Sequence, residues 1–125
     1  MGNQRITSYR DLSVWQQAMT LAETCYSLTR AFPREEMFGM TSQIRRAAAS
    51  VAANIAEGHG REATGSFIQH LRIAQGSLKE VETHLLLAVR VKLARLELVD
   101  PVLEQCQSIG KMLSALIRSL EGKGA

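Results

Sequence analysis

The chain has 125 residues, of which 46% are hydrophobic and 22% are charged, and this length fits one domain with its own core. Fifteen basic and twelve acidic residues give a net charge of +3, which is mildly basic and well short of a polycationic tail. No apolar run approaches the roughly 20 residues that span a bilayer, and the polar N-terminus lacks a signal-peptide core, so we expect a cytoplasmic protein without membrane contact. Cys25 and Cys106 form no Cys-x-x-Cys pair and are expected to be reduced core thiols.

Glycine and proline separate four segments with helical periodicity, and we predict helices over residues 11–31, 41–57, 64–94 and 100–120. The first helix can begin with a Ser13–Gln16 capping box or with Asp11 acting alone as a cap. Thr64 is the predicted N-cap of the third helix. Asp100 is the predicted N-cap of the fourth, with Pro101 at its first helical position.

Apolar residues recur at alternating spacings of three and four along the predicted helices, which is the pattern of a heptad seam. The seam of the third helix contains Phe67, Leu71, Ala74, Leu78, Val81, Leu85 and Ala88, and that of the fourth contains Val99, Leu103, Cys106, Gly110, Leu113, Ile117 and Leu120. No stretch alternates with a period of two, so strands are not expected. Short connections favour an all-α, antiparallel up-down-up-down four-helix bundle over residues 11–121, with an arm at 1–10 and a tail at 122–125.

The first helix has two apolar stripes, although a helix in one small bundle needs only one. Val14, Ala18, Leu21, Cys25, Leu28 and Phe32 form the first stripe, and Leu12, Trp15, Met19, Ala22 and Tyr26 form the second. Either the large residues of the second stripe cover the edge of the core, or the stripe packs against another copy. Because an exposed apolar patch on a small protein usually marks an interface, the pattern favours a ring-like homo-oligomer in which Trp15, Met19 and Tyr26 lie at the contact.

The second helix has a polar row beside its apolar stripe, formed by Gln43, Arg46, Ser50, Asn54, Glu57 and Arg61. The row is either a solvated face or a hydrogen-bonded network in an interface, since unpaired buried polar groups cost about 1–3 kcal/mol each. Gly76 lies in the middle of the third helix, where it is either a tolerated glycine or the site of a close helix crossing. The neighbouring face, which includes Glu80, can meet this row or a ligand.

No residue pattern indicates an enzyme, a metal site or a cofactor. Glu-x-x-His spacing is absent, as are phosphate loops and a nucleophile elbow, and both cysteines lie in core stripes. Basic side chains make nucleic-acid contact an open hypothesis, because oligomerisation multiplies a modest charge into a larger field. The candidate phosphate-binding residues are Arg5, Arg10, Arg45, Arg46, Arg61, Arg72 and Lys79.

Several motifs carry a resemblance to a known family; they lie at Asp11–Gln16, Phe32–Met40, Gln43–Ala48, Ser50–Val51, Asn54–Gly58, Gly60–Arg61 and Ile73–Glu80. Over about residues 9–95 the chain resembles the family named for open reading frames in intervening sequences of bacterial 23S rRNA genes. The resemblance implies a four-helix bundle that assembles as a homopentamer. It also suggests kinship with the accessory variability proteins of diversity-generating retroelements, which form similar pentamers and bind a reverse transcriptase and nucleic acid.

Two functions are compatible with these features. The first is a non-enzymatic oligomeric accessory protein that binds RNA, or a ribonucleoprotein partner such as a reverse transcriptase, through arginines around the ring. The alternative is a protein-protein interaction scaffold, in which Asn54, Glu57 and Arg61 maintain the assembly and nucleic acid is never bound.

Overall fold

The computed structural model describes residues 6–124, so Arg5 lies outside the described residues. Their secondary structure consists of four long helices and two short 3-10 turns, with no strand in the described part of the chain. The helices are α1 (Ser13–Thr29), α2 (Met40–His59), α3 (Thr64–Arg90) and α4 (Leu96–Gly124), and the turns are η1 (Tyr9–Asp11) and η2 (Arg34–Glu36). The prediction of an all-α chain with four helices is therefore confirmed.

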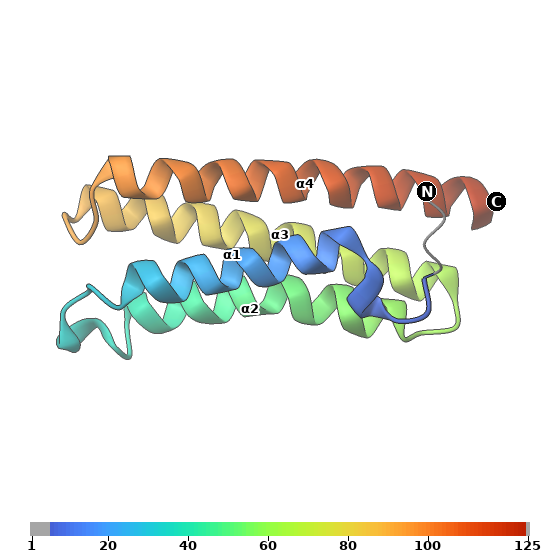
Figure 1. Ribbon diagram of the computed structural model, residues 1–125, viewed down its shortest axis with the longest axis horizontal. Coiled ribbons are helices and arrows are strands. Elements are labelled where there is room, and N and C mark those ends of the chain that lie inside the picture. Colours follow the sequence, from blue (N-terminus) through green and yellow to red (C-terminus); the bar gives the residue numbers. More distant parts are fainter. Residues whose placement is uncertain (1–5, 125) are drawn as a thin grey trace.

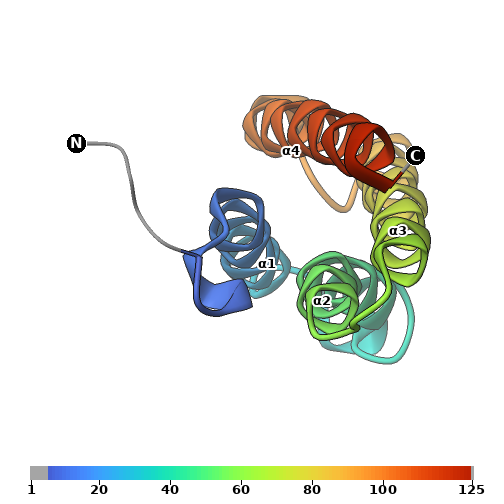
Figure 2. The ribbon, with the colours of Figure 1, turned by 90° about the vertical axis from the view of Figure 1, so that its right-hand side faces the viewer.

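The four helices lie lengthwise beside one another, and the connections between successive helices alternate between the two ends (Figure 1). In the view along the helices, α1, α2, α3 and α4 follow one another around a common centre (Figure 2). Each helix contacts the next, and α1 also contacts α4, so all four helices enclose one core.

The core follows the predicted seams closely in α3 and less closely in α4. Six of the seven seam residues of α3 are buried, and only Phe67 is half-buried. In α4 the buried residues are Val99, Val102, Cys106, Ile109, Leu113 and Ile117. Three residues that the seam prediction placed in the core are half-buried: Leu103, Gly110 and Leu120. The inward face of α4 is therefore turned by about one residue along part of its length.

The predicted start of the fourth helix is wrong. α4 begins at Leu96, four residues before Asp100, so Pro101 lies inside the helix rather than at its first position. Proline this close to a helix start removes only one backbone hydrogen bond near the end, which the packed helix tolerates. α4 also continues to Gly124, into the segment predicted to be a tail.

The start of α1 is also different from the prediction, because its N-cap is Leu12 and makes no side-chain cap. The capping box belongs to η1, where Ser8 Oγ accepts from the Arg10 backbone N–H and Asp11 Oδ2 accepts from the Ser8 backbone N–H. Hydrogen bonds from Thr7 and Ser8 hold the pKa of Asp11 below its ordinary value of 3.8. Ala63, and not Thr64, is the N-cap of α3.

Candidate nucleic-acid interface and polar row

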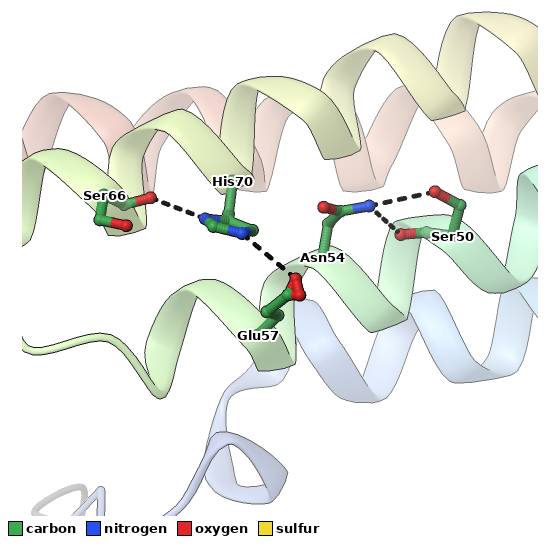
Figure 3. Close-up of polar contacts among 5 residues, drawn as sticks. All are labelled: Ser50, Asn54, Glu57, Ser66 and His70. Carbon is green, nitrogen blue, oxygen red and sulfur yellow. Dashed lines mark hydrogen bonds and ion pairs between the residues drawn. The ribbon is translucent and has the colours of Figure 1, made fainter.

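The polar row of α2 faces α3 along part of its length. Ser50 Oγ lies 2.9 Å from Ser77 Oγ on α3, where either hydroxyl can donate. Asn54 donates from Nδ2 to the Ser50 carbonyl at 2.9 Å and to Ser50 Oγ at 3.1 Å (Figure 3). Ser77 is 5% exposed, so this hydrogen bond satisfies a hydroxyl that α2 and α3 remove from water.

The next turn of α2 continues the contact through a histidine. His70 Nε2 lies 3.3 Å from Glu57 Oε1, an ion pair when the imidazole is protonated. Its Nδ1 lies 2.9 Å from the Ser66 carbonyl, which can only accept, so Nδ1 is the donor there (Figure 3). The two helices are thus connected at both Ser50 and Glu57 by side chains of one row.

The sequence reasoning missed the α3 half of this row. His70 reads in sequence as a solvated or edge residue, yet its side chain is only 15% exposed. Ser66, His70 and Ser77 are spaced by four and seven residues, which places them on one face of a helix beside the Leu71–Leu78 seam. That spacing is the feature of the sequence that could have indicated the α3 half of the row.

The other members of the row lie at the surface. Gln43 and Arg46 are exposed on α2, and Arg61 is exposed in the connection to α3. Glu80 is likewise exposed on α3. Asn54, Glu57 and Arg61 therefore do not form one connected cluster within the chain.

The close helix crossing within the chain occurs at Gly58, and Gly76 is not the site of one. A Cβ built at Gly58 would lie 2.6 Å from His70 Cβ and 3.0 Å from Phe67 Cδ1. A Cβ at Gly76 would meet nothing within 4 Å. Since Gly58 sits near the C-terminus of α2, it reads in sequence as a helix stop, which concealed its packing function.

The predicted phosphate-binding residues divide into two groups. Arg45, Arg72 and Lys79 are engaged within the chain: Arg45 donates to Thr29 Oγ1 at 2.8 Å, Arg72 pairs with Glu121 at 2.8 Å and Lys79 pairs with Glu82 at 3.2 Å. Arg45 also lies 4.4 Å from the ring centroid of Tyr26. Its guanidinium therefore holds α1 against α2.

Arg10, Arg46 and Arg61 form the second group; all three are exposed and make no ion pair with any described residue. Arg10 does approach the Tyr9 ring, 5.7 Å from its centroid. Arg10 precedes α1 and Arg61 follows α2, so both lie at the same end of the molecule (Figure 1). Of the predicted phosphate-binding residues, these three are the ones most available to an anionic partner.

The second stripe of α1 is only partly covered within the chain. Met19 is 42% exposed and Tyr26 is 43% exposed, while Trp15 is half-buried and packs edge-to-face against Tyr9 with ring centroids 5.2 Å apart. Trp15 thus does cover an edge of the core, whereas Met19 and Tyr26 present apolar surface to solvent.

Both cysteines are buried free thiols. Burial raises the pKa of Cys25 and of Cys106 from 9.0 to about 12, because the thiolate would be poorly solvated. We expect the native protein to react with a thiol reagent at pH 8 at least tenfold more slowly than the urea-unfolded chain, followed by absorbance of the released chromophore. Equal rates in the two states would contradict the burial.

Among residues 6–124, no group of three or more His, Cys, Asp or Glu side chains could hold a metal ion. None of the described helices has the length and apolar character needed to cross a membrane.

Four long helices in mutual contact place the chain in the class of small all-α proteins. Comparison with known proteins then gives its family. The model of the 23S rRNA-intervening sequence protein family matches residues 10–115, and the chain belongs to this family. A crystal structure of a protein of unknown function from the S23 ribosomal protein family of Bacteroides thetaiotaomicron is similar, with 26% identity and a TM-score of 0.74. The match covers 83% of this chain and 97% of that one. Among curated proteins no match was found.

Proposed function

We propose that this chain is a non-enzymatic cytoplasmic protein that assembles as a ring-like homo-oligomer of antiparallel bundles, a pentamer by family resemblance, and binds RNA or a ribonucleoprotein partner. The observation that supports RNA binding is the exposure of Arg10, Arg46 and Arg61 without an ion pair in the described chain. Cations that are free of internal partners can release counterions from phosphates. Because the family is named for intervening sequences of 23S rRNA, RNA of that kind is the partner to test first.

The ring matters to this proposal because one copy carries a formal charge of only +3. Repetition around a ring places several copies of each free arginine on one surface, which raises the local potential without changing any single copy. Affinity for RNA should therefore depend on assembly.

An RNA-binding titration tests the proposal with the double variant Arg46→Ala/Arg61→Ala and a hairpin transcript from a 23S rRNA intervening sequence. We expect wild-type binding at about 50 mM salt that weakens as salt rises, because each neutralised phosphate contributes about 0.7–0.9 to the slope of log K against log salt. Removing two phosphate contacts per copy should lower that slope by about two for each copy that contacts RNA. The measurement is filter binding across a salt series.

The matched control is Arg90→Ala/Arg95→Ala, which removes two exposed cations that are not among the predicted phosphate-binding residues and should leave the slope near that of the wild type. Absence of wild-type affinity at low salt would contradict RNA binding. Equal losses in both double variants would contradict the assignment to Arg46 and Arg61.

A protein-interaction scaffold is the second candidate, and the exposed Met19 and Tyr26 side chains favour it because they suit a protein contact with or without RNA. Arg61→Ala separates the two. If the protein is an RNA binder, the variant keeps its oligomeric state in sedimentation and loses affinity. If Arg61 maintains a scaffold, the variant dissociates.

A further inference from the structure

Helices α3 and α4 form a groove of about 610 Å³ on the surface of the molecule. Gly76 of α3 and Gly110 of α4 both line it, together with the apolar side chains of Leu78 and Cys106. A Cβ at Gly76 would meet nothing within 4 Å, and one at Gly110 would only touch Leu78 at 3.9 Å. The glycines therefore serve no close contact inside the chain, and they leave room for an external side chain.

The charge of this groove is positive. Lys79, Lys111 and Arg118 line it, and Glu82 is its one acidic residue. Lys79 pairs with Glu82 at 3.2 Å, which leaves Lys111 and Arg118 without an ion pair among the described residues. An occupant with an apolar ridge and a negative charge would complement the groove.

The exposed face of α1 has this chemistry. Met19, Ala22 and Tyr26 form the apolar part of this helix face, which we call the α1 ridge, and the carboxylate of Glu23 and the guanidinium of Arg30 lie beside them. Glu23 is exposed and makes no ion pair with a described residue. The same chain thus carries both a positively charged groove and a ridge with a negative charge at Glu23 and a positive charge at Arg30, both unpaired among the described residues.

Contacts between neighbouring helices give the heights of these groups along the molecule. Arg45 of α2 stacks over Tyr26 of α1, and Ser50 of α2 meets Ser77 of α3. Ser50 lies five residues after Arg45 on α2, and each residue of a helix adds about 1.5 Å along its axis. Because α2 runs opposite to α1, these five residues lead toward the N-terminus of α1 (Figure 1). Ser77 is therefore at about the height of Leu21.

The heights of Lys79 and Lys111 along the molecule follow from the same rise per residue. α3 runs in the direction of α1 (Figure 1), so Lys79, two residues after Ser77, lies at about the height of Glu23. Gln75 of α3 donates to Ser114 of α4 at 3.1 Å, which places Lys111 within about one residue of the same height. The negative charge of the ridge and the two lysines of the groove thus share one level.

We propose that the α1 ridge of one copy docks into the α3–α4 groove of the next copy, with Glu23 against Lys111 and beside the Lys79–Glu82 pair. This inference rests on the proposed ring, in which copies related by an axis along the helices lie at equal height. The two surfaces differ, so the contact is heterologous and each copy is both donor and acceptor, as ring closure requires. Arg30, the cation at the end of the ridge, lies seven residues after Glu23, about 10 Å further along α1. In the docked arrangement this displacement is toward Glu82 of the groove.

Charge reversal tests the contact by sedimentation velocity of the full chain, with circular dichroism to verify folding. Glu23→Lys and Lys111→Glu should each weaken association at least tenfold, because each places like charges opposite one another. Glu23→Lys/Lys111→Glu in one chain should recover most of the wild-type association. Glu104→Lys reverses an exposed charge of α4 outside the groove and should leave association unchanged.

Three outcomes would overturn the proposal. If the wild type assembles and the single variants assemble equally well, the docking contact is wrong although the ring stands. Failure of the double variant to recover also excludes this pairing of charges. A wild-type chain that sediments as a single subunit would overturn the ring and the docking contact together.

Discussion

Replacing Leu21 with alanine is expected to lower the free energy of unfolding by about 2–5 kcal/mol. Leu21 lies on the first stripe of α1 and is fully buried, so truncation leaves a cavity among the four helices. The helix itself loses nothing, since alanine is the better helix former. Urea unfolding followed by circular dichroism measures the change.

Met19→Ala is the matched control on the second stripe of the same helix. Met19 is 42% exposed, so its truncation should change the stability of the single subunit by well under 1 kcal/mol. It should instead weaken association, which appears as a loss of stability only at high protein concentration. Unfolding at two concentrations separates these effects. A loss for Met19→Ala equal to that for Leu21→Ala at the lower concentration would contradict the division of α1 into two faces.

Gly58→Ala is expected to destabilise the fold by about 1–3 kcal/mol, against the usual gain from replacing glycine inside a helix. The new methyl group would lie 2.6 Å from His70 Cβ, which is fixed to the backbone of α3 and cannot rotate away. α2 and α3 must then separate, which strains the Glu57–His70 contact. Thermal unfolding of the variant measures the loss.

Gly76→Ala provides the comparison, because the same substitution at Gly76 meets no atom within 4 Å. It should stabilise the subunit by up to about 1 kcal/mol through helix propensity alone. If Gly58→Ala unfolds at or above the temperature of Gly76→Ala, the close crossing at Gly58 is wrong.

Periodicity predicted most of the fold because burial in helices repeats every three or four residues. The number of helices and the core of α3 follow directly from it. The helix starts did not follow: Asp100 and Pro101 look like an N-terminus in isolation, yet α4 begins at Leu96, and of its first four residues only Val99 is buried. Local capping preferences of about 1 kcal/mol yield to tertiary contacts of that size or larger.

The candidate site was less accessible from sequence, because pairing across helices depends on their relative height. Arg45 and Arg46 are neighbours and look equivalent in sequence, yet Arg45 is held by Thr29 and Tyr26 and Arg46 is free. Likewise, Gly58 and Gly76 are both helical glycines. Only the three-dimensional structure shows that Gly58 lies in a close crossing with α3, whereas Gly76 borders an open groove. Sequence gives the face of a residue but not its partner.

The mass of the purified chain in solution tests the central claim, that the exposed ridge of α1 is covered by an identical copy. Sedimentation velocity at micromolar concentration should give an assembly of several 13.8 kDa subunits, and Met19→Ala should associate more weakly. A wild-type protein that sediments at 13.8 kDa across this range would contradict the account.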